Sequence, residues 1–154
     1  MSGMYPDTKT GDAATAAIIA ALYVVLGVTF QPIGWGAWQM RIAQVLIPLI
    51  GWLPGALPGV MVGHIAFNYL FPSPMIPWDY FSPFVFLPAR LLIWKYGDKA
   101  LPLHIASIAV YVGWMITITF GGPLWFNILT IIPGESLAEL YLGRILSKQL
   151  RDRI

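Results

Sequence analysis

The sequence contains no cysteine and few charged residues, and both shortages narrow the class of protein. Without cysteine there is no disulfide, no thiolate nucleophile and no Cys-based metal site. Only 10% of the residues are Asp, Glu, Lys or Arg, whereas about a quarter is usual in a globular domain. Because 58% of the residues are hydrophobic, a water-soluble fold of this size could not bury the apolar surface. The composition predicts an integral membrane protein.

The apolar segments also lack the period-two alternation of a membrane β-barrel, so helices are the expected spanning structure. Breaks at Gly, Pro and the scarce charges predict an all-α fold, a compact bundle of six transmembrane helices in residues 13–148. A short polar tail precedes it at 1–12, and a basic cytoplasmic tail follows at 149–154. The expected helices cover roughly residues 13–30, 39–53, 56–71, 80–97, 101–120 and 125–148. The second and third are short for a bilayer, and they could instead form a re-entrant pair.

The basic residues predict the orientation in the cell membrane. They fall before the first helix, between the fourth and fifth, and after the sixth, at Lys9, Lys95, Lys99, Lys148, Arg151 and Arg153. The loops expected on the other side, near 31–38, 71–79 and 121–124, contain only Asp79 as a charge. Cytoplasmic loops carry the excess of Lys and Arg. We therefore expect a multi-pass plasma-membrane protein in contact with lipid, with both termini cytoplasmic.

Small residues recur every four positions on the first expected helix. Such spacing lets a second helix approach closely in the membrane. The rows fit either a docking surface for a partner protein or a helix contact within the bundle. They consist of Ala13, Ala17 and Ala21, and of Ala16 and Ala20.

Glu135 ends a run from Ala100 to Gly134 that contains no Asp, Glu, Lys or Arg. An acid at the end of so apolar a stretch is costly unless protein groups or a ligand surround it. Glu135 is therefore a candidate binding residue. The alternative is an acid at the membrane interface or at a helix start after Pro133-Gly134, near the positive end of the helix dipole.

Other polar and aromatic residues of the expected external half complete a candidate binding site. Arg41 and Gln44 are three apart and share a face if the second helix begins near Gln39. An inward Arg needs an acid, and Asp79 or Glu135 could supply it. Each polar residue could instead bond a neighbouring helix, and Arg90 could snorkel or pair with Glu139. The predicted solute-binding set is Trp35, Trp38, Arg41, Gln44, His64, Asn68, Asp79, Asn127 and Glu135.

Three short segments occur in an order that resembles the QueT family of queuosine-precursor transporters. They are Gln39-Met-Arg-Ile-Ala-Gln44, Ile76-Pro-Trp-Asp-Tyr80, and Pro123-Leu-Trp-Phe-Asn127 followed by Gly134-Glu135. The resemblance implies the six-helix fold of a substrate-binding subunit, or S component, of an energy-coupling factor (ECF) importer. It implies as partners a membrane coupling subunit, which the alanine-rich first helix would contact, and two cytoplasmic ATPases. The implied solute is a 7-deazaguanine. Relatives are expected to carry an acid where this chain has Gln44, so the exact solute stays open.

Other function classes have little support in the sequence. No phosphate-binding loop is present, so the chain itself would not hydrolyse ATP, and there is no domain for nucleic acid. With two His, no Cys and no acidic cluster, neither an enzyme nor a metal or cofactor site is expected. One alternative remains, a solitary secondary transporter or channel that uses Glu135 as an ion or proton site. It predicts ion-dependent uptake by this chain alone.

Overall fold

The structure is a computed structural model that describes residues 9–34 and 40–153. Within these ranges the chain is helical and contains no β-strand, as the sequence predicts. The elements in chain order are α1 (Lys9–Thr29), α2 (Gln31–Gly34), the 3-10 helix η1 (Ile42–Gly51), α3 (Ala56–Leu70), α4 (Trp78–Val85), α5 (Leu87–Tyr96), the 3-10 turn η2 (Gly97–Ala100), α6 (Leu101–Phe120), α7 (Leu124–Ser136), the π-helical segment η3 (Leu137–Gly143) and α8 (Arg144–Arg151).

The longer elements form six consecutive helical segments, close to the six expected ones. Helices α4 and α5 follow one another in the fourth segment, and α7, η3 and α8 form the sixth. Two stretches are long and apolar enough to cross a membrane, Gly11–Thr29 and the run Trp78–Phe120 that joins α4, α5 and α6. Helices η1 and α3 have 10 and 15 residues. At about 20 Å each, they are shorter than a hydrocarbon core of about 30 Å.

Helix η1 lies at the centre of the bundle, although its conformation differs from the expected α-helix. Its 10 residues follow 3-10 geometry and include Pro48. Runs of this type longer than three or four residues are uncommon, and they often mark a functional hinge or a strained segment. Leu46, Ile47, Leu49 and Ile50 are at most 2% exposed and form the main hydrophobic core together with α1 and α3. Other elements of the bundle therefore pack against η1 along most of its length.

Helices α1 and α3 pack closely because glycines of α3 meet alanines of α1. A Cβ atom on Gly59 would lie 2.7 Å from the Ala16 carbonyl oxygen, and one on Gly63 would lie 2.9 Å from that of Ala20. The row Ala16 and Ala20 is therefore a contact within the bundle. Ala13, Ala17 and Ala21 are exposed on the outer side of α1. The structure thus separates the two rows and leaves one of them exposed.

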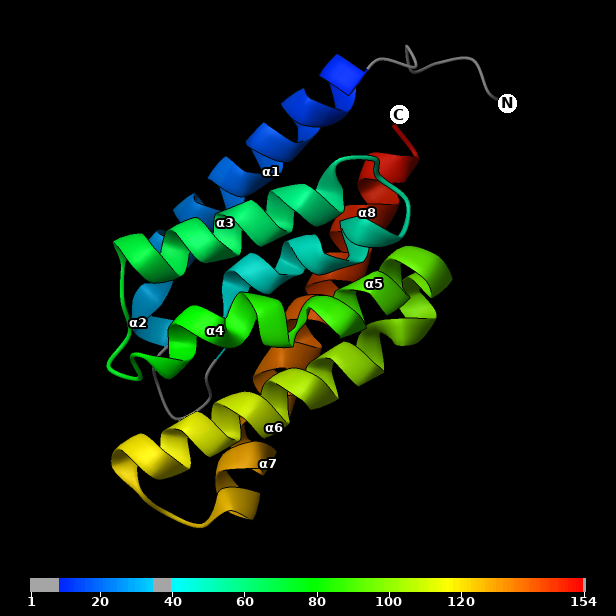
Figure 1. Ribbon diagram of the computed structural model, residues 1–154. Coiled ribbons are helices and arrows are strands. Elements are labelled where there is room, and N and C mark those ends of the chain that lie inside the picture. Colours follow the sequence, from blue (N-terminus) through cyan, green and yellow to red (C-terminus); the bar gives the residue numbers. More distant parts are fainter. Residues whose placement is uncertain (1–8, 35–39, 154) are drawn as a thin grey trace.

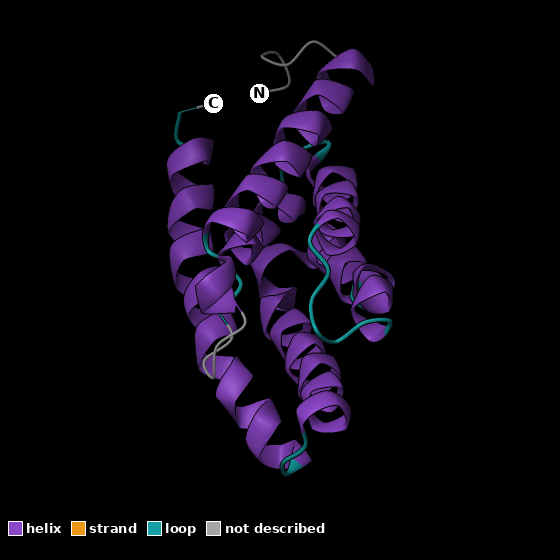
Figure 2. Cartoon of the chain, turned by 90° about the vertical axis from the view of Figure 1, so that its left-hand side faces the viewer, coloured by secondary structure: helices purple, strands orange, loops and turns teal. Residues whose placement is uncertain are grey.

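The two ends of the bundle differ in what they carry. The start of α1 and the end of α8 lie at the same end in both views (Figures 1 and 2). Arg144 of α8 and Asp98 of η2 form an ion pair of 3.7 Å at that end. The connections 71–77 and 121–123 lie at the other end (Figure 1). This arrangement agrees with the expected grouping of the basic segments on one side.

Candidate functional site

Many of the polar side chains point into the bundle instead of lying on its surface. Burying so many polar groups is costly unless they bond one another or a ligand. The polar residues that are at most 9% exposed are Gln44, His64, Asn68, Ser73, Asp79, Ser82, Arg90, His104, Asn127, Glu135, Glu139 and Ser147. This set includes most of the predicted solute-binding residues.

Glu135 lies inside a helix, and the alternative that placed it at a helix start is wrong. Helix α7 begins at Leu124 and continues through Pro133 to Ser136. Pro133 does not end the helix because the helical backbone turns around it into η3. Glu135 is 3% exposed, so it does not lie at a solvent interface. Its Oε2 atom has no hydrogen-bond partner among the described residues.

A small cavity in the bundle brings together three of the predicted residues, Arg41, Gln44 and Glu135. Arg41 was expected to lie within the second helix. In the structure it precedes that helix and has an extended backbone. Gln44 sits in the first turn of η1 and is 1% exposed, and its Oε1 atom is unpartnered within the described structure. The cavity has room for about one water molecule. Its lining is Gly34, Arg41, Gln44, Phe86, Ile108, Val112 and Glu135.

Asp79, at the start of α4, is the acid that lies close to Arg41. Its Oδ1 atom is 3.8 Å from Arg41 Nη2. Asn68 of α3 donates to the Asp79 carbonyl at 2.6 Å and to Ser82 Oγ at 3.0 Å. Ser82 in turn donates to the Asp79 carbonyl at 2.8 Å. These bonds fix the start of α4 against α3 and hold the Asp79 carboxylate near the guanidinium.

His64 connects two arginines in the interior. Its Nε2 atom lies 2.8 Å from Arg41 Nη1, and its Nδ1 atom lies 2.9 Å from Arg90 Nη2. The ring is completely buried between Tyr23 and Phe86, with ring centroids 5.4 Å and 6.1 Å away. His64 does not line the cavity. The structure therefore places this predicted binding residue behind Arg41.

Arg90 is an inward-facing cation that sequence reasoning assigned differently. It neither snorkels nor pairs with Glu139, because it is 0% exposed and no carboxylate of the described chain lies within 4.0 Å. Its Nη1 atom donates to Met61 Sδ at 3.3 Å. Glu139, in η3, instead bonds His104 Nδ1 at 2.8 Å, with both side chains fully buried. The sequence feature that could have indicated a buried Arg90 is its position as a lone Arg within an apolar segment.

The last three predicted residues are Asn127, which does not line the cavity, and two tryptophans outside the described chain. Asn127 donates to Thr117 Oγ1 at 2.9 Å and to the Gly121 carbonyl at 3.2 Å. These bonds join α7 to α6, which is the helix-to-helix contact that the alternative interpretation expected. Trp35 and Trp38 fall within residues 35–39, outside the described ranges. A solute-binding role of all three stays a prediction.

Phe86, between α4 and α5, supplies an aromatic surface that sequence reasoning missed. It is 1% exposed and lines the cavity opposite the polar groups of η1 and α7. Tyr111 packs edge-on against it at 5.7 Å. The sequence around Phe86 is rich in aromatic residues, so composition alone did not single it out.

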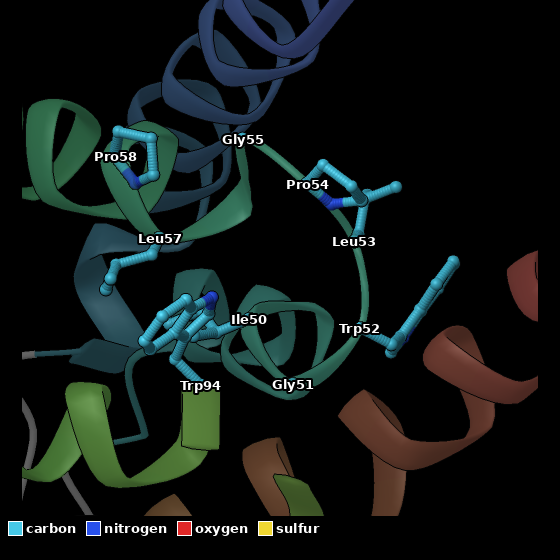
Figure 3. A pocket seen from close by; sticks show the side chains of 9 residues that line it. All are labelled: Ile50, Gly51, Trp52, Leu53, Pro54, Gly55, Leu57, Pro58 and Trp94. Carbon is cyan, nitrogen blue, oxygen red and sulfur yellow. The ribbon is translucent and has the colours of Figure 1, made fainter. Parts of the chain in front are cut away.

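A larger pocket of about 330 Å³ opens at the other end of η1. Figure 3 shows Trp94 of α5 on its wall near Leu57, while Trp52 points away toward α8. The Trp52 indole donates to Ser147 Oγ at 2.7 Å. The lining contains no charged side chain. The pocket therefore lacks a side chain that would pair with a charged solute.

The small cavity brings hydrogen-bond donors and acceptors together. Glu135 Oε2 and Gln44 Oε1 are acceptors without a partner in the described structure, and Arg41 presents donors beside them. Phe86 offers an aromatic face for stacking. Among the described residues no group of three His, Asp or Glu side chains is placed to hold a metal ion.

Comparison with known proteins yields one match. The family model described as QueT transporter matches residues 13–152, which is nearly the whole chain. No curated protein and no solved structure matches the sequence.

Proposed function

The chain belongs to the QueT transporter family, and from this we propose that it is the membrane-embedded solute-binding subunit of an ATP-driven importer of the ECF type. Family membership assigns it a role in membrane transport. We further propose that the solute is a planar, vitamin-like molecule, a queuosine precursor of the 7-deazaguanine class. The subunit would capture the solute outside and deliver it by docking onto a coupling subunit.

The pattern of unpaired groups in the cavity is the observation that carries the proposed solute. One edge of a guanine-like base presents the N1–H, the exocyclic amine and, beside them, a carbonyl oxygen. A carboxylate accepts from two adjacent donors, and a guanidinium donates to the carbonyl. Glu135 and Arg41 line the same cavity and supply these two groups, and Gln44 adds a further acceptor. Buried groups of this kind discriminate strongly against molecules that leave them unpaired.

The size of the cavity supports a binding step that includes opening and closing. Room for about one water molecule is too little for a bicyclic base, so the cavity has to widen before it can admit the solute. Arg41 has no helix to hold it, because it precedes η1 in an extended conformation. We propose that Arg41 and the loop around Pro74 move to admit the solute and then close over it.

The outer face of α1 supports docking onto a partner. Ala13, Ala17 and Ala21 are exposed along one side of the helix, where the bundle itself leaves them free. A second membrane helix could approach the α1 backbone closely there. We propose this row as the contact with the coupling subunit, which two cytoplasmic ATPases would drive. We also propose six membrane crossings with both termini in the cytoplasm, consistent with the shared position of the start of α1 and the end of α8 (Figures 1 and 2).

The second candidate function, a solitary transporter that uses Glu135 as an ion or proton site, has one observation in its favour. Glu139 lies four residues after Glu135, and both side chains are buried with an oxygen unpartnered among the described groups. Closely spaced buried carboxylates are typical of proton and cation sites in transporters.

The experiment that tests the proposal combines binding and transport. The purified protein should bind 7-aminomethyl-7-deazaguanine in calorimetry, and mass spectrometry of solutes extracted from it should detect a deazapurine. Vesicles that contain this chain alone should show no uptake, whereas vesicles with a coupling subunit and ATPases should accumulate the solute only with ATP. Uptake by the chain alone, driven by an ion gradient, would instead establish the solitary transporter.

A further inference from the structure

The His64 ring lies between two arginines, and it cannot accept hydrogen bonds from both. Arg41 Nη1 is 2.8 Å from Nε2, and Arg90 Nη2 is 2.9 Å from Nδ1. A neutral imidazole has one N–H and one nitrogen lone pair. A doubly protonated ring would turn both nitrogens into donors that face donors. One of the two arginines must therefore face an N–H group.

The neighbouring residues decide which nitrogen carries the proton. Ser82 Oγ lies 3.2 Å from Nε2, and the serine hydroxyl already donates to the Asp79 carbonyl at 2.8 Å. One lone pair of Ser82 accepts from Asn68 at 3.0 Å, which leaves the other to accept from an Nε2–H. On the other side, Arg90 is fully buried, and its remaining hydrogen bond goes to the weak acceptor Met61 Sδ at 3.3 Å. The Nδ1 lone pair thus gives Arg90 a strong acceptor at hydrogen-bond distance.

This tautomer takes the His64 lone pair away from Arg41. Its Nη1 atom then lies 2.8 Å from another donor. Its closest carboxylate oxygen is Asp79 Oδ1, 3.8 Å from Nη2, which is longer than a hydrogen bond. Arg41 keeps 15% of its side chain exposed and lines the cavity beside Glu135. A guanidinium so placed gains an acceptor when a solute enters.

We propose that His64 is a positioning residue that acts through Arg41. By holding the Nε2–H tautomer, it withholds an acceptor from Arg41, so that Arg41 donates to the carbonyl oxygen of the bound solute. This inference rests on the proposed function for the identity of the solute, but the tautomer can be measured without any solute. It differs from the sequence prediction, in which His64 contacts the solute directly.

The tautomer is measured by nitrogen NMR on the ligand-free protein with labelled histidine. The chain has only His64 and His104, so His104→Gln assigns the two rings. We expect His64 to carry its proton on Nε2, with Nδ1 unprotonated. A proton on Nδ1, or protons on both nitrogens, would overturn the proposal whatever the protein binds.

The link to binding is tested with Ser82→Ala, because Ser82 does not line the cavity. Removing its hydroxyl takes away the acceptor for Nε2–H, so the proton should move to Nδ1 and Nε2 should accept from Arg41. We expect the affinity for 7-aminomethyl-7-deazaguanine to fall about tenfold, and the affinity for an analogue without the carbonyl oxygen to fall much less. Ser147→Ala, at a buried serine near Trp52, is the matched control and should change neither.

The outcomes separate this inference from the proposed function. A moved proton with unchanged affinity in Ser82→Ala would overturn the link between His64 and Arg41. An equal loss for both compounds would do the same, since it would show a merely structural effect. Failure of the wild-type protein to bind any deazaguanine would instead refute the proposed solute, while the ligand-free spectrum would still decide the tautomer.

Discussion

Replacing Glu135 with Gln should weaken solute binding without unfolding the bundle. The side chain is 3% exposed, and its Oε2 atom is unpartnered in the described structure. An ionised carboxylate there accepts two charge-assisted bonds from a guanine-like edge. Gln keeps one acceptor oxygen, loses the charge and places an NH₂ group against a ligand donor. The loss of one charge-assisted bond costs about 1.5–3 kcal/mol, which corresponds to a roughly 10- to 150-fold weaker affinity.

Calorimetry on the purified variant measures this loss, and two comparisons make it specific. Glu139→Gln is the matched control, because Glu139 is equally buried, lies one turn further on and bonds His104 instead of lining the cavity. Its affinity should stay near that of the wild type. The second comparison uses a ligand that lacks the exocyclic amine. In a double cycle, Glu135→Gln should lose less affinity for that ligand, because one of the two donors that face the carboxylate is already absent.

The thermal midpoint separates a binding effect from a folding effect. An unpaired buried carboxylate is costly, so its replacement by a neutral amide should leave the midpoint unchanged or raise it. Unchanged affinity in a folded Glu135→Gln protein would refute the reasoning and remove Glu135 from the site. Equal losses in Glu135→Gln and Glu139→Gln would also refute it, since they would point to a general electrostatic effect.

Three further predictions follow from named contacts. Ala17→Leu should spare solute binding and impair co-purification with a coupling subunit, whereas Ala20→Leu, directed at α3, should lower the thermal midpoint; intact assembly in Ala17→Leu would contradict the docking row. Gly59→Ala should destabilise the bundle by about 1–3 kcal/mol in denaturant unfolding, because the new Cβ atom would meet the Ala16 carbonyl at 2.7 Å. Asp79→Asn should weaken binding of an aminomethyl-substituted deazaguanine more than that of a cyano-substituted one; equal losses would exclude an ion pair between Asp79 and the ligand.

The order of helices could be predicted from the sequence because chain breaks are local events. The segment 51–55 separates η1 from α3, and Gly55 within it has a positive φ. Gly121 and Gly122 separate α6 from α7, and both have a positive φ. Glycine adopts that backbone region at no steric cost, so these breaks are visible without any tertiary information. Pro133 was ambiguous by this local signal, because the expected helix 125–148 runs through it whereas the alternative began a helix just after it. It resembled a helix boundary, but packing in the bundle carries the helix past it into a π-helical segment.

The sequence by itself determined that this chain is helical and apolar and that Glu135 is an unusual acid. These properties follow from composition and from the absence of charge over long stretches, which depend on no contact between distant residues. Only the tertiary structure decided which groups meet, because an apolar helix in a bundle shows little periodic difference between its faces. It placed Arg41 and Glu135 on one cavity, put His64 between Arg41 and Arg90, and separated two alanine rows that look alike in the sequence.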